Sequence, residues 1–210
     1  MNEPEGVIKF ELHHTHAPLP AGIDLRPVNA WRTLFHRLGL IGQNPGRYDG
    51  YGFGNISFKS DSTTGQFIIS GTQTGHLEAL ETDHYCMVTG TEIIKNRLYS
   101  TGLSKPSSEA LTHACVYQQD PEIKAVIHVH SPELWIKTKE LGLPYTPVSV
   151  LYGTPEMASA VKELFTGGQL DSCSIFSMQG HEDGIVAFGR SLEAAAWALI
   201  NCWIKSKCVE

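Results

Sequence analysis

The residues Ala125-Val126-Ile127-His128-Val129-His130-Ser131 lie at the centre of the fold that the sequence predicts. This apolar, β-branched run is typical of a buried strand, on which residues two apart face the same side. His128 and His130 therefore project together, with their Cα atoms about 6–7 Å apart. One Zn²⁺ ion, at roughly 2 Å from a nitrogen of each ring, fits between them. Two imidazoles on a buried strand need a polar partner, and we expect a metal ion to be that partner.

Length and composition limit the possible functions. A chain of 210 residues that is 41% hydrophobic can bury one sizeable core. We therefore expect a single domain over residues 25–210, preceded by an N-terminal arm over residues 1–24. Sixteen Lys and Arg against 22 Asp and Glu give 16 − 22 = −6, and no basic run occurs. This balance argues against nucleic acid or an anionic membrane as partner, but a small anionic substrate is compatible with it because backbone amides can bind phosphate.

Cysteine usage and the N-terminus indicate a cytoplasmic protein. The five cysteines are odd in number, scattered, and never spaced Cys-x-x-Cys, which is typical of reduced thiols. No stretch reaches 18 apolar residues, and the first residues, Met-Asn-Glu-Pro-Glu-Gly, lack a signal-peptide pattern.

The pattern of helices and strands predicts a layered α/β domain. Helices are expected from Pro27, from Ser107 to Tyr117, and over 132–141, 155–165 and 192–205. Strands are expected beside them at 55–59, 66–70, 84–89, 93–100, 174–178 and 184–188, in addition to the strand that carries His128.

A catalytic metal usually takes three protein ligands. The best third ligand is His181, at the predicted turn between two apolar strands, although an ordinary solvated turn histidine is the alternative. His13, His14 and His16 form a second group, but their surroundings are polar and rich in proline. We expect an exposed segment without metal there.

Three short stretches have the composition of anion-binding turns. Pro106-Ser107-Ser108-Glu109 opens a predicted helix, where free backbone amides attract anions, although an ordinary helix cap would look the same. Gly54-Asn55-Ile56-Ser57 begins a strand and Thr74-Gly75 follows one. Glycine at these turns permits close approach of a ligand. Each stretch is a weak signal by itself.

In combination, these motifs and His128-Val129-His130-Ser131 with His181 resemble the class II aldolase/adducin superfamily, in order and in rough spacing. The resemblance covers about residues 27–205 and is nearest to L-fuculose-1-phosphate aldolase-like members. It implies a three-layer α/β/α fold around a mixed, largely antiparallel sheet. It also implies a homotetramer with sites between subunits.

The resemblance further implies particular roles. His128, His130 and His181 would bind a divalent metal, usually Zn²⁺, although Mn²⁺, Co²⁺ or Fe²⁺ would also suit three imidazoles. Glu109 would be the catalytic acid and base. The substrate phosphate would lie among six residues, namely Gly54, Asn55, Thr74, Gly75, Ser107 and Ser108.

The sequence departs from the family pattern at two places. Glycine follows the third metal histidine directly in typical members, whereas Glu182 and Asp183 precede Gly184 here. Asp183 is therefore an alternative third ligand, and we prefer His181 because imidazole matches the other two ligands. Ser149 stands where the fuculose-phosphate enzymes have a tyrosine, and Tyr152 lies nearby in the sequence.

Our leading hypothesis is a metal-dependent aldolase that cleaves a small ketose phosphate through a metal-stabilised enediolate. A decarboxylase, epimerase or dehydratase would use the same centre to break a different bond. A non-catalytic, adducin-like interaction module belongs to another class of function, and the complete set of histidines with Glu109 argues against it.

Overall fold

A mixed sheet organises the computed structural model, which describes residues 6–59 and 65–209. Over these residues the strand order is β1-β7-β6-β5-β4-β8-β11-β10-β9. The two outermost pairs, β1 with β7 and β9 with β10, are parallel, and the pairs between them are antiparallel. The strands are β1 Glu11–His16, β4 Asn55–Phe58, β5 Phe67–Ser70, β6 Tyr85–Glu92, β7 Arg97–Gly102, β8 Ala125–His130, β9 Tyr145–Thr146, β10 Ile175–Met178 and β11 Gly184–Gly189. β2 Gly42–Gln43 and β3 Gly52–Phe53 form a separate small ribbon.

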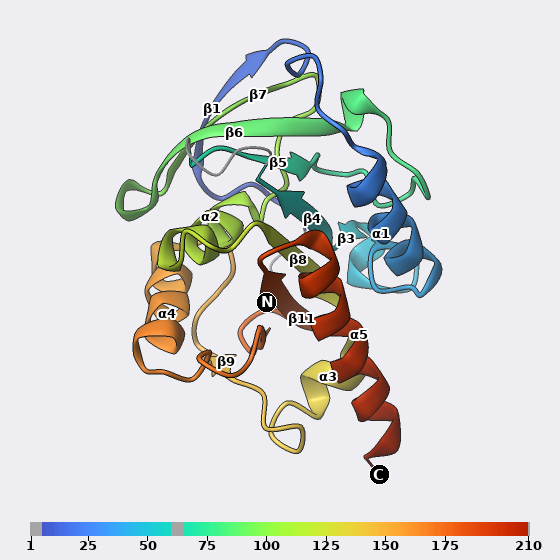
Figure 1. Ribbon diagram of the computed structural model, residues 1–210, viewed down its shortest axis with the longest axis vertical. Helices are drawn as coiled ribbons and strands as arrows, with labels where there is room; N and C mark the ends of the chain where they lie inside the picture. The colour runs from blue at the N-terminus through green and yellow to red at the C-terminus, as the bar shows by residue number, and fades with distance from the viewer. Residues whose placement is uncertain (1–5, 60–64, 210) are drawn as a thin grey trace.

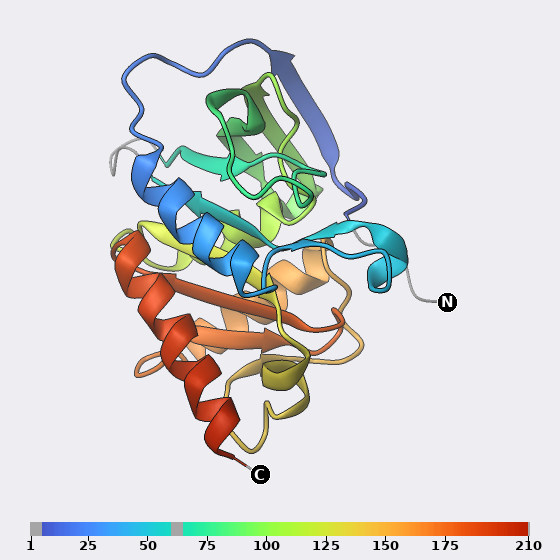
Figure 2. The ribbon, with the colours of Figure 1, turned by 90° about the vertical axis from the view of Figure 1, so that its right-hand side faces the viewer.

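Helices cover both faces of the sheet, which confirms the predicted three-layer α/β/α fold. Figures 1 and 2 show α2 and α4 on one face and α1, α3 and α5 on the other. The α-helices are α1 Arg26–Arg37, α2 Ala110–Gln119, α3 Pro132–Ile136, α4 Pro155–Thr166 and α5 Leu192–Cys208, and the short 3₁₀ segments are η1 Tyr48–Gly50, η2 Thr82–His84 and η3 Ile93–Lys95.

Strand β8 lies in the middle of the sheet, between β4 and β11, and every residue of it is buried. Its side chains alternate between the two apolar cores. Val126 packs with residues of α2 and α4, whereas Ile127 and Val129 pack with residues of α1 and α5. Because residues two apart share a face, His128 and His130 lie on the side of Val126. Both histidines therefore face the layer that contains α2.

Several predicted boundaries differ from the structure. The helix expected from Ser107 begins only at Ala110, because Ser107–Ala110 forms a turn that is closed by the Ala110 N–H on the Ser107 carbonyl at 3.1 Å. The strand expected over 93–100 is divided into η3 and β7. The helix expected over 132–141 ends at Ile136 and continues as turns. In each case local hydrogen bonds set where the helix or strand begins and ends, and apolar periodicity does not specify them.

The segment predicted as an N-terminal arm contains strand β1, which the sequence did not predict. Glu11–His16 pairs in parallel with Arg97–Gly102 at the edge of the sheet. Most of its side chains are polar and exposed, and Leu12 is its one apolar residue, so the strand lacks the apolar alternation on which the prediction relied. Residues 1–5 of the predicted arm lie outside the described residues, and the division at residue 24 stays a prediction.

No helix in the described part of the chain is long and apolar enough to cross a membrane. The five cysteines are free thiols, of which Cys86, Cys115 and Cys202 are buried.

Candidate metal centre

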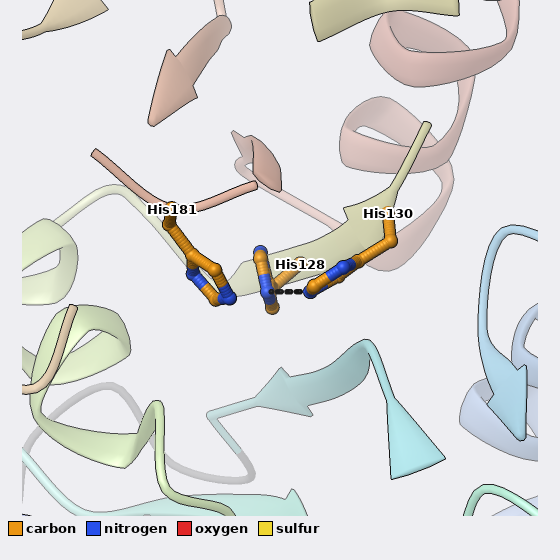
Figure 3. A group of neighbouring side chains, drawn as sticks. All are labelled: His128, His130 and His181. Atoms are coloured by element: carbon orange, nitrogen blue, oxygen red, sulfur yellow. Dashed lines mark hydrogen bonds between the residues drawn. The ribbon is translucent and has the colours of Figure 1, made fainter. Parts of the chain in front are cut away.

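Three histidines that the sequence singled out converge in the fold. His128 and His130 project from β8, and His181 comes from the turn between β10 and β11 (Figure 3). The Nε2 atoms of His128 and His130 are 3.2 Å apart. One ring nitrogen from each histidine forms a group whose atoms all lie within 4.8 Å of one another. The three side chains are buried, with exposed fractions of 3% or less.

The turn that holds His181 is shaped by close backbone contacts. The His181 N–H donates to the Met178 carbonyl, and the Gly184 N–H donates to the His181 carbonyl, each at 3.0 Å. Asp183 adopts the left-handed conformation with φ 62°, which Asp tolerates better than most residues. A Cβ atom at Gly184 would lie 3.2 Å from Cγ of His181. The absence of a side chain at Gly184 therefore lets the imidazole lie directly against β11. Gly184 itself pairs with His130 in the strand register.

Burial keeps the strand histidines neutral. It lowers the pKa of His128 and of His130 well below the usual value, and the neighbouring His181 lowers both further. Nδ1 of His128 lies 3.2 Å from the Ile185 carbonyl. Since a carbonyl only accepts, Nδ1 carries the proton and Nε2 keeps its lone pair towards His130. A neutral imidazole fixed in this way is the form that binds a metal.

The donor set fits a divalent metal ion. Tetrahedral coordination at about 2.0–2.1 Å places two ligand nitrogens roughly 3.3 Å apart, and the separation between His128 and His130 is 3.2 Å. Three imidazole ligands also leave one coordination position for a substrate, as catalytic sites require. The chemistry of three imidazoles does not select one metal.

Glu109 lies beside this cluster, at the turn that precedes α2. Its Oε1 is 3.5 Å from Nδ1 of His181, and its Oε2 accepts a hydrogen bond from the Thr112 hydroxyl at 2.7 Å. The side chain is fully buried. The fold thus brings the carboxyl group of Glu109 to the imidazole of His181. The hydrogen bond from Thr112 of α2 fixes the orientation of that carboxyl group.

Asp183, the alternative third ligand, contacts other groups. Its Oδ2 accepts from the Tyr48 hydroxyl at 2.5 Å and lies 3.6 Å from a guanidinium nitrogen of Arg47. The Tyr48 ring in turn packs edge-on against His130, with centroids 4.7 Å apart. Sequence reasoning missed Tyr48 and Arg47, because neither belongs to a pattern and 135 residues separate Tyr48 from Asp183.

A polar cavity lies near the histidines and contains all six residues of the predicted anion pocket. Asn55 connects the two sites, since it pairs with His128 in the β4–β8 register. Ser107 and Ser108 bring the cavity next to Glu109 in the chain. No charged side chain of the described residues lines it. Its lining consists of Gly6, Gly52, Gly54, Asn55, Gly71, Thr72, Gln73, Thr74, Gly75, Ser107 and Ser108.

The remaining candidates lie apart from the three histidines or in supporting positions. His13 and His16 are exposed on β1, and His14 contacts the Ser100 hydroxyl at 2.9 Å. No metal-binding group of the described residues includes them. Ser149 lies in an exposed turn. Tyr152 is buried and stacks on His181 with ring centroids 4.5 Å apart.

Comparison with known proteins agrees with this fold. The family described as Class II Aldolase and Adducin N-terminal domain matches residues 46–202. The chain is 32% identical over 96 residues to a 3-oxo-tetronate 4-phosphate decarboxylase from Pectobacterium atrosepticum, a match that covers 37% of this chain and 44% of the decarboxylase. It is 26% identical over 170 residues to a methylthioribulose-1-phosphate dehydratase from Leptospira biflexa, over 68% of this chain and 78% of that protein.

The fold is also found in L-fuculose-1-phosphate aldolase from Thermus thermophilus. The two structures superpose with a TM-score of 0.63 at 16% identity, covering 87% of this chain and 90% of the aldolase. Because the family match extends over most of the sequence, this chain belongs to the class II aldolase/adducin family. Enzymes of this superfamily are metal-dependent lyases.

Proposed function

We propose that this chain is a metal-dependent aldolase that cleaves a carbon–carbon bond in a small ketose phosphate. The observation that carries the proposal is the convergence of three buried imidazoles with the carboxyl group of Glu109. His128, His130 and His181 would hold the divalent ion, with Zn²⁺ as first choice and Mn²⁺, Co²⁺ or Fe²⁺ as alternatives. Once bound, such an ion supplies Lewis-acid chemistry that stabilises negative charge on the substrate oxygens as the bond breaks.

The protein residues supply binding and proton transfer. Gly54, Asn55, Thr74, Gly75, Ser107 and Ser108 hold the substrate phosphate through amides and hydroxyl groups. Glu109 delivers a proton to the substrate carbon released by cleavage, and it removes that proton in the synthetic direction. The Thr112 hydroxyl fixes one oxygen of Glu109, so that Oε1 is the oxygen turned towards the histidine cluster.

Related reactions would use the same residues with a different bond broken. The relatives that match by sequence are a decarboxylase and a dehydratase, and Ser149 replaces the tyrosine expected of fuculose-phosphate enzymes. A decarboxylase, dehydratase or epimerase is therefore the second candidate. A non-catalytic adducin-like module is disfavoured because it has no need of Glu109 beside a complete metal site. Release of CO₂, of water or of an aldehyde, or inversion of a sugar centre, separates these reactions.

The proposal is tested by assaying the purified protein with ketose 1-phosphates, with and without a chelator. We expect the chelator to abolish turnover and added Zn²⁺ to restore it. Glu109→Ala should lower the turnover number at least about a hundredfold, because a general acid–base catalyst is lost. Glu122→Ala, at an exposed position outside the site, is the control. Turnover that resists the chelator, or full activity of Glu109→Ala, would rule out this mechanism.

A cytoplasmic location and assembly as a homotetramer are further parts of the proposal. The first is supported by the five free cysteines, and the second by family membership alone.

A further inference from the structure

A buried guanidinium group lies behind the polar cavity. Arg32 of α1 is 1% exposed. Its Nη1 donates to the carbonyls of Leu77 and Glu78 at 2.6 and 2.9 Å, and its Nη2 donates to the carbonyl of Thr74 at 2.8 Å. Among the described residues Arg32 forms no ion pair with a carboxylate. Burial lowers its pKa, yet a guanidinium keeps its proton in proteins. Burying a cation without an anionic partner costs free energy of folding, which favours a role for Arg32 beyond packing.

The hydrogen bonds of Arg32 fix the direction of the peptide groups in the 74–78 loop. His36, one helical turn after Arg32, lies with Nε2 3.1 Å from the Gly75 carbonyl, so this nitrogen donates. The carbonyls of Thr74, Gly75, Leu77 and Glu78 all point towards α1. In a planar trans peptide the N–H points opposite to the C=O. The N–H groups of Gly75 and His76 consequently point away from α1.

The lining of the cavity includes residues of this loop but none of α1. Thr74 and Gly75 line it, whereas Arg32 and His36 do not. Gly75 lies tightly against the neighbouring ribbon, since a Cβ atom there would be 2.2 Å from the Gly42 carbonyl oxygen. The loop is therefore held from both sides, with three carbonyls on Arg32 and one on His36, and with the Gly75 and His76 amides directed away from α1.

We infer that Arg32 is a positioning residue of the anion pocket. It orients the Gly75 and His76 amides towards a phosphate group and supplies the fixed positive charge that the lining of the cavity lacks. This inference rests on the proposed function for the view that the ligand is a phosphate. It explains how a pocket without a charged lining side chain holds a dianion, because the compensating charge lies one peptide layer behind the wall.

The test is binding of inorganic phosphate to the zinc-loaded protein, measured by titration calorimetry. Arg32→Lys keeps the charge but cannot reach three carbonyls at once, and we expect the Kd for phosphate to rise roughly tenfold or more. Arg32→Met removes the charge as well and should raise the Kd further. Arg37→Lys is the matched control, because Arg37 lies on the same helix and contacts the same loop through the exposed Glu78 side chain. Its Kd should stay within about twofold of wild type.

Two readouts separate positioning from a purely structural role. The visible spectrum of Co²⁺ bound in place of zinc should be unchanged in Arg32→Lys, which would show that the histidine site is intact. In the wild-type protein, phosphate should slow hydrogen exchange of the amides in residues 74–77, and this measurement needs no variant. Unchanged phosphate affinity in folded Arg32→Lys, or exchange in residues 74–77 that ignores phosphate, would overturn the inference.

These measurements do not depend on turnover. A protein without lyase activity that still loses phosphate affinity in Arg32→Lys would support the inference and contradict the proposed function. A wild-type protein that fails to bind phosphate but shows chelator-sensitive lyase activity on an unphosphorylated substrate would overturn the inference and the phosphate part of the proposed function, but not its metal-dependent lyase chemistry.

Discussion

Single residues determine which side chain would complete the candidate metal site. His181 presents a ring nitrogen to His128 and His130 within the same small group. The Asp183 carboxylate is engaged by Tyr48 and Arg47. His181 and Asp183 are only two positions apart in the sequence, yet they contact different groups. Substituting each in turn can therefore show which of them binds the metal.

We predict that His181→Ala lowers zinc affinity at least about a hundredfold, because one of three protein ligands is lost. Asp183→Asn keeps a hydrogen-bond acceptor for Tyr48 and should retain zinc within about tenfold of wild type. Competition with a chromophoric chelator measures both affinities. A larger loss in Asp183→Asn than in His181→Ala would assign the third ligand to the aspartate.

At the scale of elements, the loops around the cavity depend on close backbone approach. A Cβ atom at Gly75 would meet the Gly42 carbonyl oxygen at 2.2 Å, and two backbone segments would have to separate. We predict that Gly75→Ala destabilises the protein by about 1–3 kcal/mol and weakens phosphate binding. Gly90→Ala is the control, since the nearest atom to its Cβ would be at an ordinary 3.5 Å. Urea unfolding measures the difference, and equal stability of the two variants would contradict this account.

Helix α2 also carries a buried polar group one turn beyond Glu109. His113 accepts or donates through Nδ1 at 2.7 Å from the Ser57 hydroxyl, which lies 2.8 Å from the Tyr117 hydroxyl. Its Nε2 is buried without a hydrogen-bond partner among the described residues. Burial lowers the pKa of His113 to about 3. The folded protein therefore holds this ring neutral at pH values where the unfolded chain binds a proton.

Linkage gives the sign of the resulting pH dependence. In the unfolded chain His113 titrates near its ordinary pKa. The contribution of the buried, neutral ring to the free energy of unfolding is therefore complete above about pH 6.5 and declines as the pH falls towards 3. We predict that His113 alone lowers the free energy of unfolding by about 2 kcal/mol between pH 7.5 and pH 5. His113→Gln should reduce this slope when unfolding is followed at several pH values. An unchanged slope would show that other groups cause the acid sensitivity.

At the scale of the whole molecule, the family relationship predicts assembly of four copies. We expect multi-angle light scattering of the purified protein to give about four times the monomer mass of 23.1 kDa. The mass should persist on dilution to micromolar concentration. A monomer that is nevertheless fully active would show that one chain contains the complete site.

Much of the layered fold was predictable because its signals are local. The apolar run of β8, the helical patterns over 155–165 and 192–205, and the turn residues before Gly184 each follow from neighbouring residues. The same holds for two of the site histidines, since alternation on one strand brings His128 and His130 together. β1 escaped prediction because an exposed edge strand carries no apolar pattern.

The sequence by itself determined the type of fold, the family, and the residues that converge on a candidate metal site. Only the tertiary structure placed Tyr48 on Asp183 and His130, and the Arg32 guanidinium behind the Thr74 loop. The physical reason is the range of the contacts. Periodicity and turn chemistry act between close neighbours along the chain, whereas these partners lie 42 to 135 residues apart and meet only once the sheet and its helices have packed.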